Sequence, residues 1–388
     1  MQQYDILVVG GGMIGATVAL GLAKAGNSVA VIEARLPKPY EPEQSPDLRV
    51  SAISLASEQL LATLGAWANI ENTRLCPYRH LAVWEDRAMR TNFSAADLAI
   101  DHLGHIIENR LVQAGVIDAL KACTNATVIN AEVSRFDFNQ RPTLYLTDQS
   151  VLQADWLIGA DGANSAVRTA AEIGVTGWQY KQQALGINIK TDGEQQDITW
   201  QQFTPDGPLA FLPLYDGFAS LVWYHNADQI QYLQQLSHQQ LKKEIQKTFP
   251  SELVNFDILQ VASFALNRMH ANRYYQGRVL LIGDAAHTIN PLAGQGVNLG
   301  FKDISCLLEL IDKNGMPGTE ADINNLFDAY QRGRRHDNLL MSNGMDLLYK
   351  TFSNDIVPLK WLRNSVLGAT NKIAPMKRQM MKYALGLS

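Results

Sequence analysis

The sequence is poor in cysteine and contains no long apolar run. Its 388 residues include three cysteines, Cys76, Cys123 and Cys306, which lie far apart without C-x-x-C or metal-ligand spacing. An odd, scattered set argues against a disulfide framework and is typical of a reducing compartment. Nowhere do about 18 uncharged apolar residues follow one another, so we expect no membrane-spanning helix. The first apolar run begins at Ile6, which leaves no room for a cleaved signal segment, and we expect a cytoplasmic protein.

Positive charge is outnumbered overall but dominates the C-terminal end. The chain has 33 Lys and Arg against 38 Asp and Glu, a net charge of −5, which argues against nucleic-acid binding. Beyond Asp355 there is no acidic residue, while basic ones accumulate: Lys360, Arg363, Lys372, Lys377, Arg378 and Lys382. If residues 376–387 form a helix, one face carries Met376, Met380, Tyr383 and Leu387. We expect this tail either to dock on its own domain or to contact anionic lipid or a partner protein.

A glycine-rich turn near the N-terminus lies between a predicted strand and a predicted helix. The apolar run Ile6 to Val9 precedes it, and Ala16 to Lys24 follows. Its glycines stand in G-x-G-x-x-G spacing, with two apolar residues before the last: Gly10, Gly12, Met13, Ile14 and Gly15. The next predicted strand, Val29 to Ile32, leads into Glu33. Such a turn lets a pyrophosphate approach the helix N-terminus while the acid binds ribose hydroxyls, so a dinucleotide site is predicted; a plain tight turn is the alternative.

A second segment, far along the chain, shows the same order of predicted strand, glycine-containing turn and helix. Val279 to Ile282 predicts a buried strand, a turn follows at Gly283 and Asp284, and a helix opens near Gly296. Asp284 is placed to accept a hydrogen bond from a ribose or ribityl hydroxyl, and Gly294 and Gly296 permit flat contact with a ring system. The positive end of that helix suits the negative charge of a reduced flavin. For His287 we favour a structural hydrogen bond in the turn over a catalytic role.

Three motifs together resemble the aromatic-hydroxylase group of FAD monooxygenases. They are the glycine turn with Glu33, a middle D-G motif at Ala160 to Ser165, and G-D-A-A-H…P-x-x-G-Q-G-x-N from Gly283 to Asn298. The resemblance implies that Asp161 and Arg168 lie near the FAD phosphates or the nicotinamide cofactor; an Asp–Arg pair that holds a turn is the structural alternative. It further implies that Pro291 lies near the reactive edge of the flavin and that Asn298 belongs to the cofactor site.

Over nearly its full length the chain resembles the ubiquinone-biosynthesis hydroxylases. Their early D-x-R-x-[SA]-A-[IL]-S segment corresponds to Asp47 to Ser54. The resemblance implies that Arg49 lies near the flavin and that Arg110 contacts the pyrophosphate, although each could be a surface ion-pair partner. Three further segments resemble the member that hydroxylates 2-polyprenyl-3-methyl-6-methoxy-1,4-benzoquinol: residues 199–208, 220–224 and 377–387.

The resemblance implies a fold and a division of the chain. With 46% apolar residues, the chain can form two packed domains. We expect an α/β composite: a Rossmann-like FAD-binding domain with an inserted, mostly antiparallel substrate domain and a C-terminal helical region. The FAD-binding domain is assigned to 1–75, 104–178 and 271–335, the substrate domain to 76–103 and 179–270, and the helical region to 336–388.

Short alternating runs between residues 179 and 270 predict the strands of the inserted sheet. Ile198 to Phe203, Ala210 to Leu214 and Ala219 to Tyr224 are separated by turn residues. Several of these runs are apolar on both faces, so one face is expected to meet something apolar besides its own helices. Candidate walls of a ring pocket, each of which could be plain core instead, are Phe203, Phe211, Pro213, Trp223 and Tyr224.

The implied reaction is a ring hydroxylation. NAD(P)H reduces FAD, the flavin reacts with O2, and a C4a-hydroperoxide passes its distal oxygen to a polyprenyl benzoquinol. The protein then orients the substrate and excludes water, so we assign no acid–base residue. Attack at another ring position, a flavin reductase or dehydrogenase acting on polyprenyl groups, and a non-catalytic scaffold remain as alternatives. A lipid-tailed substrate also suits peripheral contact with the inner membrane and a ubiquinone-biosynthesis assembly.

Overall fold

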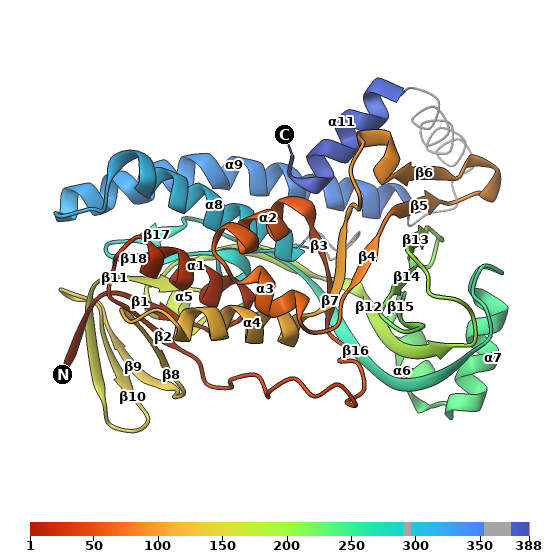
Figure 1. Ribbon diagram of the computed structural model, residues 1–388, viewed down its shortest axis with the longest axis horizontal. Helices are drawn as coiled ribbons and strands as arrows, with labels where there is room; N and C mark the ends of the chain where they lie inside the picture. Colours follow the sequence, from red (N-terminus) through yellow and green to blue (C-terminus); the bar gives the residue numbers. More distant parts are fainter. Residues whose placement is uncertain (290–295, 353–373, 388) are drawn as a thin grey trace.

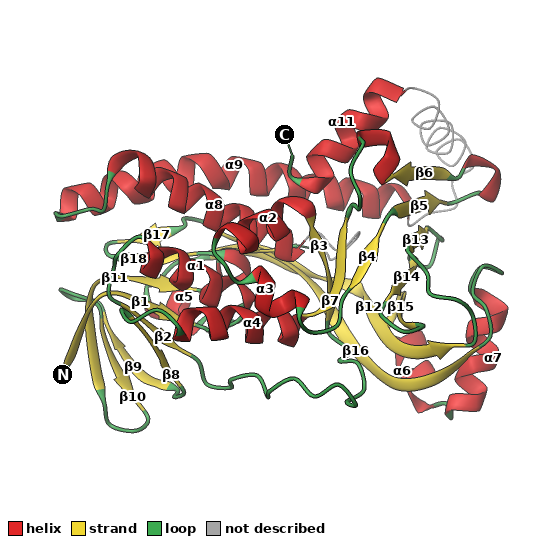
Figure 2. Ribbon diagram, in the orientation of Figure 1, coloured by secondary structure: helices red, strands yellow, loops and turns green. Residues whose placement is uncertain are grey.

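A parallel sheet flanked by helices forms one half of the molecule, and a curved antiparallel sheet forms the other (Figures 1 and 2). The computed structural model describes residues 1–289, 296–352 and 374–387. The first sheet has the strand order β17 (Tyr275–Gln276), β18 (Val279–Leu281), β11 (Val151–Gly159), β1 (Gln2–Val9), β2 (Val29–Ile32) and β8 (Ala126–Ile129). The hairpin of β9 (Val133–Asp137) and β10 (Thr143–Leu146) extends it from β11. This half is the predicted Rossmann-like unit.

Four neighbouring strands of this sheet run parallel and end at the same level. Ile32 of β2 pairs with Val9 of β1, Val9 with Gly159 of β11, and Gly159 with Leu281 of β18. The apolar runs of the sequence explain their burial, since Ile6, Leu7 and Val8 are fully enclosed. The residues that follow each strand therefore meet along one sheet edge, which is where open α/β sheets bind ligands.

Helices pack against this sheet in one shared hydrophobic core. They are α1 (Met13–Lys24), α4 (Asn109–Lys121), the short α5 (Ala166–Ala170), α8 (Gly296–Asn314) and α9 (Glu320–Phe352). A three-stranded sheet of β3 (Val50–Ser54), β7 (Gly104–Glu108) and β4 (Cys76–Tyr78) lies beside α2 (Leu55–Thr63) and α3 (Trp67–Glu71). α9 runs without a break past residue 335, so the C-terminal helical region is continuous with the FAD-binding half. The three-part division of the chain otherwise stays a prediction.

The second large sheet is antiparallel except where β5 (His80–Trp84) pairs with β13 (Ile198–Gln202). Its other strands are β6 (Thr91–Ser94), β14 (Leu209–Pro213), β15 (Phe218–Asn226), β12 (Val175–Thr191), β16 (Phe256–Ala271) and β19 (His287–Thr288). β12 and β16 are long and curve from one half of the molecule into the other (Figure 1). The predicted substrate sheet is therefore confirmed as mostly antiparallel.

One face of this sheet packs on α6 (Ala227–Gln235) and α7 (His238–Thr248). Trp223 lies 4% exposed in that core and meets Phe249 edge-on, with ring centroids 5.5 Å apart. Phe211 stacks on Trp200 in the same core, and Pro213 shares its face of β14 because side chains alternate along a strand. The structure thus corrects three candidate pocket walls: Phe211, Pro213 and Trp223 belong to the helix-covered core.

The C-terminal helix α11 (Ala374–Leu385) docks on its own chain. Met381 and Leu385 are 4% and 6% exposed and pack in a cluster with Tyr78 and Ile106. Lys377 forms an ion pair with Asp97 in the 3-10 turn η2 (Ala95–Leu98), with Nζ and Oδ2 2.7 Å apart. Of the predicted apolar stripe, the side chains of Met376, Met380 and Tyr383 lie outside the described residues. Within the described parts of the chain, no helix is long and apolar enough to span a membrane.

The placement of Trp223 makes a prediction about stability. We expect Trp223→Ala to lower the free energy of unfolding by about 3–5 kcal/mol, because it empties a large buried site. The neighbouring Val222 points to the other face and is partly exposed, so Val222→Ala is the matched control and should cost much less. Denaturant unfolding of both variants measures this, and equal losses would contradict the assignment of faces.

Candidate cofactor site

Two segments far apart in the sequence meet at the shared edge of the parallel strands. Ile14, in the first turn of α1, lies against Gly283 after β18 and Gly300 in α8: a Cβ on Gly300 would come within 2.7 Å of Ile14 Cδ1. The backbone N–H of Ile282 donates to the Gly159 carbonyl, and that of Ala160 donates to the Val9 carbonyl. The two predicted glycine motifs and the middle D-G motif are thereby brought side by side.

The N-terminal glycines have different tasks in this arrangement. Gly10 has φ +96°, and Gly15 approaches so closely that a Cβ there would lie 1.8 Å from the Gly10 carbonyl oxygen. A Cβ on Gly12 would meet nothing within 4 Å, and the φ of −64° at Gly12 is open to any residue. No side chain caps α1. Gly10 and Gly15 therefore build the turn, whereas Gly12 borders free space in front of an uncapped helix N-terminus, as a pyrophosphate requires.

Glu33 lies at the end of β2 beside this turn. Its Oε2 accepts a hydrogen bond from the Gly11 N–H at 2.7 Å, and its Oε1 accepts one from the Arg35 N–H at 2.9 Å. Each carboxylate oxygen has a second lone pair, so the group can still accept ribose hydroxyls. The side chain of Gln113 in α4 donates to the Gly11 carbonyl at 2.8 Å and holds the turn from the other side.

Asp284 is exposed at the turn after β18. Although this side chain reaches solvent, the dense protein around it raises the pKa of its carboxyl through desolvation; His287 opposes this shift and the negative charge of Asp303 adds to it. Among the residues that the structure describes, no group donates a hydrogen bond to this carboxylate. An acceptor without a donor at the same sheet edge as Glu33 and Gly12 fits a ligand hydroxyl, so the residues present suit a dinucleotide such as FAD.

Asn298 acts as a clamp in the first turn of α8. It is 3% exposed; its Oδ1 accepts from the Ser54 N–H and the Ser57 hydroxyl, and its Nδ2 donates to the Ala52 carbonyl. These bonds tie the second glycine motif to the segment Asp47 to Ser54. The structure thus gives Asn298 a positioning role, and direct cofactor contact by its side chain stays a prediction.

The middle motif is a well-bonded turn. The Asp161 carboxylate accepts from the Ser165 hydroxyl and from the N–H groups of Ala166 and Val167, so it caps α5. Arg168 does not pair with it directly; its guanidinium donates to the carbonyls of Ala163 and Ala285, each at 2.9 Å. Burial lowers the pKa of Arg168, and Asp161 opposes that shift. The turn therefore fastens the D-G motif to the turn after β18, and its contact with FAD stays a prediction.

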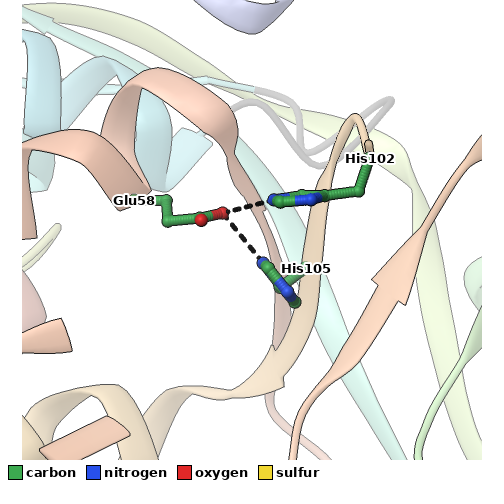
Figure 3. Close-up of side chains that lie close together, drawn as sticks. All are labelled: Glu58, His102 and His105. Carbon is green, nitrogen blue, oxygen red and sulfur yellow. Dashed lines mark hydrogen bonds and ion pairs between the residues drawn. The ribbon is translucent and has the colours of Figure 1, made fainter. Parts of the chain in front are cut away.

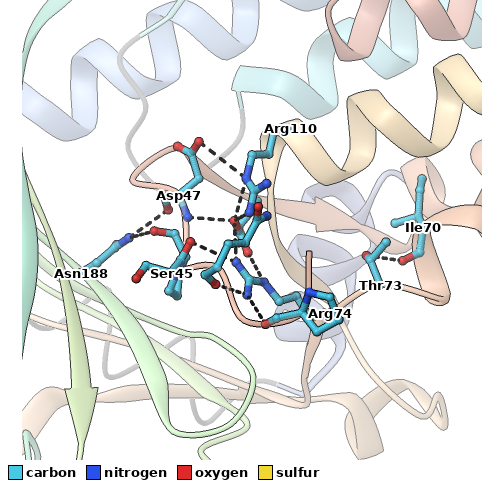
Figure 4. A network of polar contacts seen from close by, with 11 residues as sticks. Ser45, Asp47, Ile70, Thr73, Arg74, Arg110 and Asn188 are labelled. Carbon is cyan, nitrogen blue, oxygen red and sulfur yellow. Dashed lines mark hydrogen bonds and ion pairs between the residues drawn. The ribbon is translucent and has the colours of Figure 1, made fainter. Parts of the chain in front are cut away.

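Arg110 belongs to a polar network that holds the segment of residues 44–47 (Figure 4). Its guanidinium pairs with Glu108, with Nη2 and Oε2 2.8 Å apart, and more distantly with Asp47. Glu108 is 1% exposed and also binds Arg74, whose Nη1 and Nη2 donate to the carbonyls of Gln44 and Ser45. The network fixes residues 44–47 against β7. It brings Arg110 to the front of α4, while the Arg49 side chain is exposed; contact of either arginine with the cofactor stays a prediction.

His287 is buried and hydrogen-bonded to Asp303 of α8, and its structural rather than catalytic role stays a prediction. Its Nε2 lies 2.5 Å from Oδ2 of Asp303, which also accepts from the Gly283 N–H. On the other oxygen of Asp303, Arg334 and Asn338 of α9 donate. Burial alone would raise the pKa of Asp303, but His287 and Arg334 lower it to about 2. An ionised carboxylate therefore holds the turn after β18 to α8 and α9; sequence reasoning missed Asp303, Arg334 and Asn338.

The remaining predicted site residues belong either to the loop and start of α8 or to the aromatic side chains proposed as pocket walls. Gly296 begins α8, and Pro291 and Gly294 lie outside the described residues. Tyr224 is 5% exposed and lies on the face of β15 opposite Trp223, packed with Tyr180 and Leu266. Phe203 stacks on Phe352 of α9, with ring centroids 4.1 Å apart. These two aromatics are placed between the sheet and the other half of the molecule, unlike Phe211 and Trp223.

The face of the sheet that carries Tyr224 turns toward the cofactor-binding half. Asn188 of β12 lies on it, fully buried, and donates to the carbonyls of Pro46 and Asp47. Partly exposed apolar side chains follow across this face and form what we call the apolar strip: Leu81, Val83, Ala210, Leu212 and Val222. Sequence reasoning missed the strip because it selected the large aromatics at alternate positions.

Comparisons with known proteins agree with this geometry. The family model for the FAD binding domain matches residues 3–337. The 3-demethoxyubiquinol 3-hydroxylase of Escherichia coli (strain K12) is 44% identical over 388 residues, which cover 100% of this chain and 99% of that relative. The mitochondrial ubiquinone biosynthesis monooxygenase COQ6 of Rattus norvegicus is 32% identical, covering 98% of this chain and 90% of the relative. In fold, p-nitrophenol 4-monooxygenase PnpA from Pseudomonas putida DLL-E4 superimposes with a TM-score of 0.80 at 19% identity, covering 99% of both chains.

The family model and these full-length relatives, together with the fold, identify the chain as a FAD-dependent aromatic-ring monooxygenase, a class that uses O2 and a reduced nicotinamide donor. More narrowly, the chain belongs to the family of FAD-dependent hydroxylases of ubiquinone biosynthesis.

The two glycines of the turn should respond differently to alanine. We expect Gly12→Ala to fold but to be purified without FAD, because its methyl group enters space that the pyrophosphate needs. Gly15→Ala should instead destabilise the protein itself, since its Cβ collides with the Gly10 carbonyl. Flavin absorbance and thermal unfolding distinguish the two outcomes. A yellow Gly12→Ala protein with stoichiometric FAD would contradict the assigned site.

Proposed function

We propose that this protein hydroxylates the ring of a polyprenyl benzoquinol, 2-polyprenyl-3-methyl-6-methoxy-1,4-benzoquinol. The main support is the full-length similarity to a relative named for 3-hydroxylation of demethoxyubiquinol, at 44% identity. When bound and reduced by NAD(P)H, FAD supplies the activation of O2 for transfer to an electron-rich ring. The quinol hydroxyls supply the electron density of that ring, so the protein needs no nucleophile of its own.

In this proposal the sheet edge holds the cofactor along its length. Gly12 and the uncapped N-terminus of α1 face the pyrophosphate, Glu33 accepts the ribose hydroxyls, and Asp284 accepts a ribityl hydroxyl. The N-terminus of α8, fixed by Asn298, directs its positive end at the flavin ring. The buried Asp303 sets the position of the turn that carries Asp284.

The apolar strip is the proposed wall of the ring pocket. Val222 and Ala210 are cross-strand partners, and Leu212 follows on the same face. Their apolar surface favours an aromatic ring with alkyl and methoxy groups and keeps water away from the reacting oxygen. Tyr224 adjoins Val222 in one packed cluster and closes the pocket toward α9. Phe203 belongs to the same side of the sheet through its stack on Phe352.

The position of α11 connects this pocket with the lipid nature of the substrate. Met381 and Leu385 pack in the same cluster as Leu212 and Leu81 of the strip. On the outer side of the helix, Arg378 and Lys382 are exposed. We propose that this side contacts an anionic membrane surface, so that a ring can enter the pocket while its polyprenyl tail stays in the bilayer. Contact with other proteins of the pathway through the same side is a further part of the proposal.

The reaction is tested by its product. In a strain that lacks the protein, mass spectrometry of the quinones should show accumulation of this substrate, whose one unsubstituted ring carbon has not been hydroxylated, and the wild-type chain should remove it. Purified enzyme should consume one O2 per product formed. Accumulation of a quinone that lacks oxygen at another position would assign another ring carbon, and product without O2 uptake would indicate a reductase or dehydrogenase.

The pocket is tested at Val222. We expect Val222→Phe to keep stoichiometric FAD but to raise KM by about 10-fold or more, because the larger side chain fills space proposed for the ring. It should also release more hydrogen peroxide per NAD(P)H oxidised. Ile198 of β13 packs against the helix-covered core on the other face of the sheet, so Ile198→Val, which should leave KM and coupling unchanged, is the control. Unchanged KM and coupling in Val222→Phe would remove the strip from the pocket.

A further inference from the structure

Three side chains of types that can bind metal ions converge between α2 and the start of β7 (Figure 3). Oε2 of Glu58 lies 2.9 Å from Nε2 of His102 and 2.9 Å from Nδ1 of His105. The three candidate donor atoms all lie within 4.8 Å of one another. None of these side chains takes part in the cofactor site or the apolar strip, so their convergence calls for another explanation.

We propose that Glu58, His102 and His105 bind a divalent transition metal ion of the zinc type. Two imidazoles and one carboxylate are a ligand set that zinc uses in proteins, with bonds of about 2.0–2.2 Å to nitrogen and oxygen. Donors on one tetrahedral ion lie about 3.3 Å apart by that geometry. The two separations between Glu58 and the histidines are 2.9 Å, and all three donor atoms lie within 4.8 Å of one another, so side-chain movements of the order of an ångström would admit the ion.

The charge state of the cluster suits a cation. A glutamate carboxylate is ionised at neutral pH, and the two imidazoles that face Oε2 of Glu58 hydrogen-bond to this charged form. In the hydrogen-bonded arrangement each facing imidazole nitrogen carries a proton, and a metal ion would take the place of these protons at the same lone pairs.

The cluster of Glu58, His102 and His105 is held by rigid elements and is open to solvent on one side. His105 lies in β7 between two partner strands, pairing with Ile53 on one side and Pro77 on the other, and its ring packs against Trp67 at 5.2 Å. The side chains of Glu58 and His102 are 15% and 21% exposed. An ion can thus enter from solvent, and water can fill the positions that the three ligands leave free.

The site would fasten α2 to β7. Glu58 follows Ser57, which Asn298 holds, and β7 ends in Glu108, which binds Arg74 and Arg110. A bound ion would therefore stabilise the support on which the segment Asp47 to Ser54 and the start of α8 rest. Since an ion that binds only the folded protein raises its stability, occupancy should be visible in thermal unfolding.

The experiment uses the full-length, FAD-loaded protein after removal of metals with a chelator. Zn²⁺ alone is titrated by calorimetry, and Co²⁺ is added separately to follow ligand-field absorption at wavelengths beyond the flavin bands. We expect one ion per chain and a rise in Tm with Zn²⁺. Glu58→Gln and His102→Ala should each raise the Kd for Zn²⁺ by more than about 10-fold and abolish the Tm increase.

His336 supplies the matched control, because it is an exposed histidine in α9. His336→Ala should bind Zn²⁺ as the wild type does. The comparison of Tm with and without Zn²⁺ is made within each variant, so a variant that is less stable without metal still reports on binding. Absence of Zn²⁺ binding in the wild type, or equal affinity in Glu58→Gln and His102→Ala, would overturn the proposal.

Discussion

The alignment of four parallel strand ends is the constraint on which this structure depends. β2, β1, β11 and β18 are hydrogen-bonded in order, and their last residues pair at one level. The turns that follow therefore emerge along one edge, although they come from three widely separated parts of the sequence. The register of these strands is strongly specified, because a slip by one residue would turn every side chain of a strand to the other face of the sheet.

Buried polar groups then fix the turns relative to the helices. Asn298 joins the start of α8 to Ser54 and Ser57, and Asp303 joins the turn after β18 to Arg334 of α9. Such contacts are weak evidence for net stability, since desolvation offsets much of their attraction. They are directional, however, and leaving one partner alone in the interior is costly. We attribute to them the placement of the proposed cofactor groups rather than the bulk of the folding energy.

In the second sheet, side chains alternate between a face that packs on helices and a face that is proposed to bind the substrate. Leu209, Phe211 and Trp223 point to α6 and α7 and build a core, whereas Ala210, Leu212 and Val222 point to the cofactor-binding half. Large aromatics are favoured where the space between sheet and helices must be filled. Smaller aliphatic side chains leave room for a ligand on the opposite face. Phe211 and Trp223, which looked distinctive in the sequence, therefore pack in the core, whereas their inconspicuous neighbours, with Tyr224 and Phe203, form the proposed pocket.

Motif spacing determined much of this protein by itself. The glycine turn, Glu33, the strands at Val29 to Ile32 and Val279 to Ile282, and the family could all be predicted, because local backbone chemistry imposes those residues at those intervals. Only the tertiary structure decided which face of each strand is covered, that Asp161 caps a helix, and that Asp303 is a buried anchor. It alone also brought Glu58 to His102 and His105. The physical reason is that partners separated by many residues leave no periodic signal, since their distance is set by how whole elements pack.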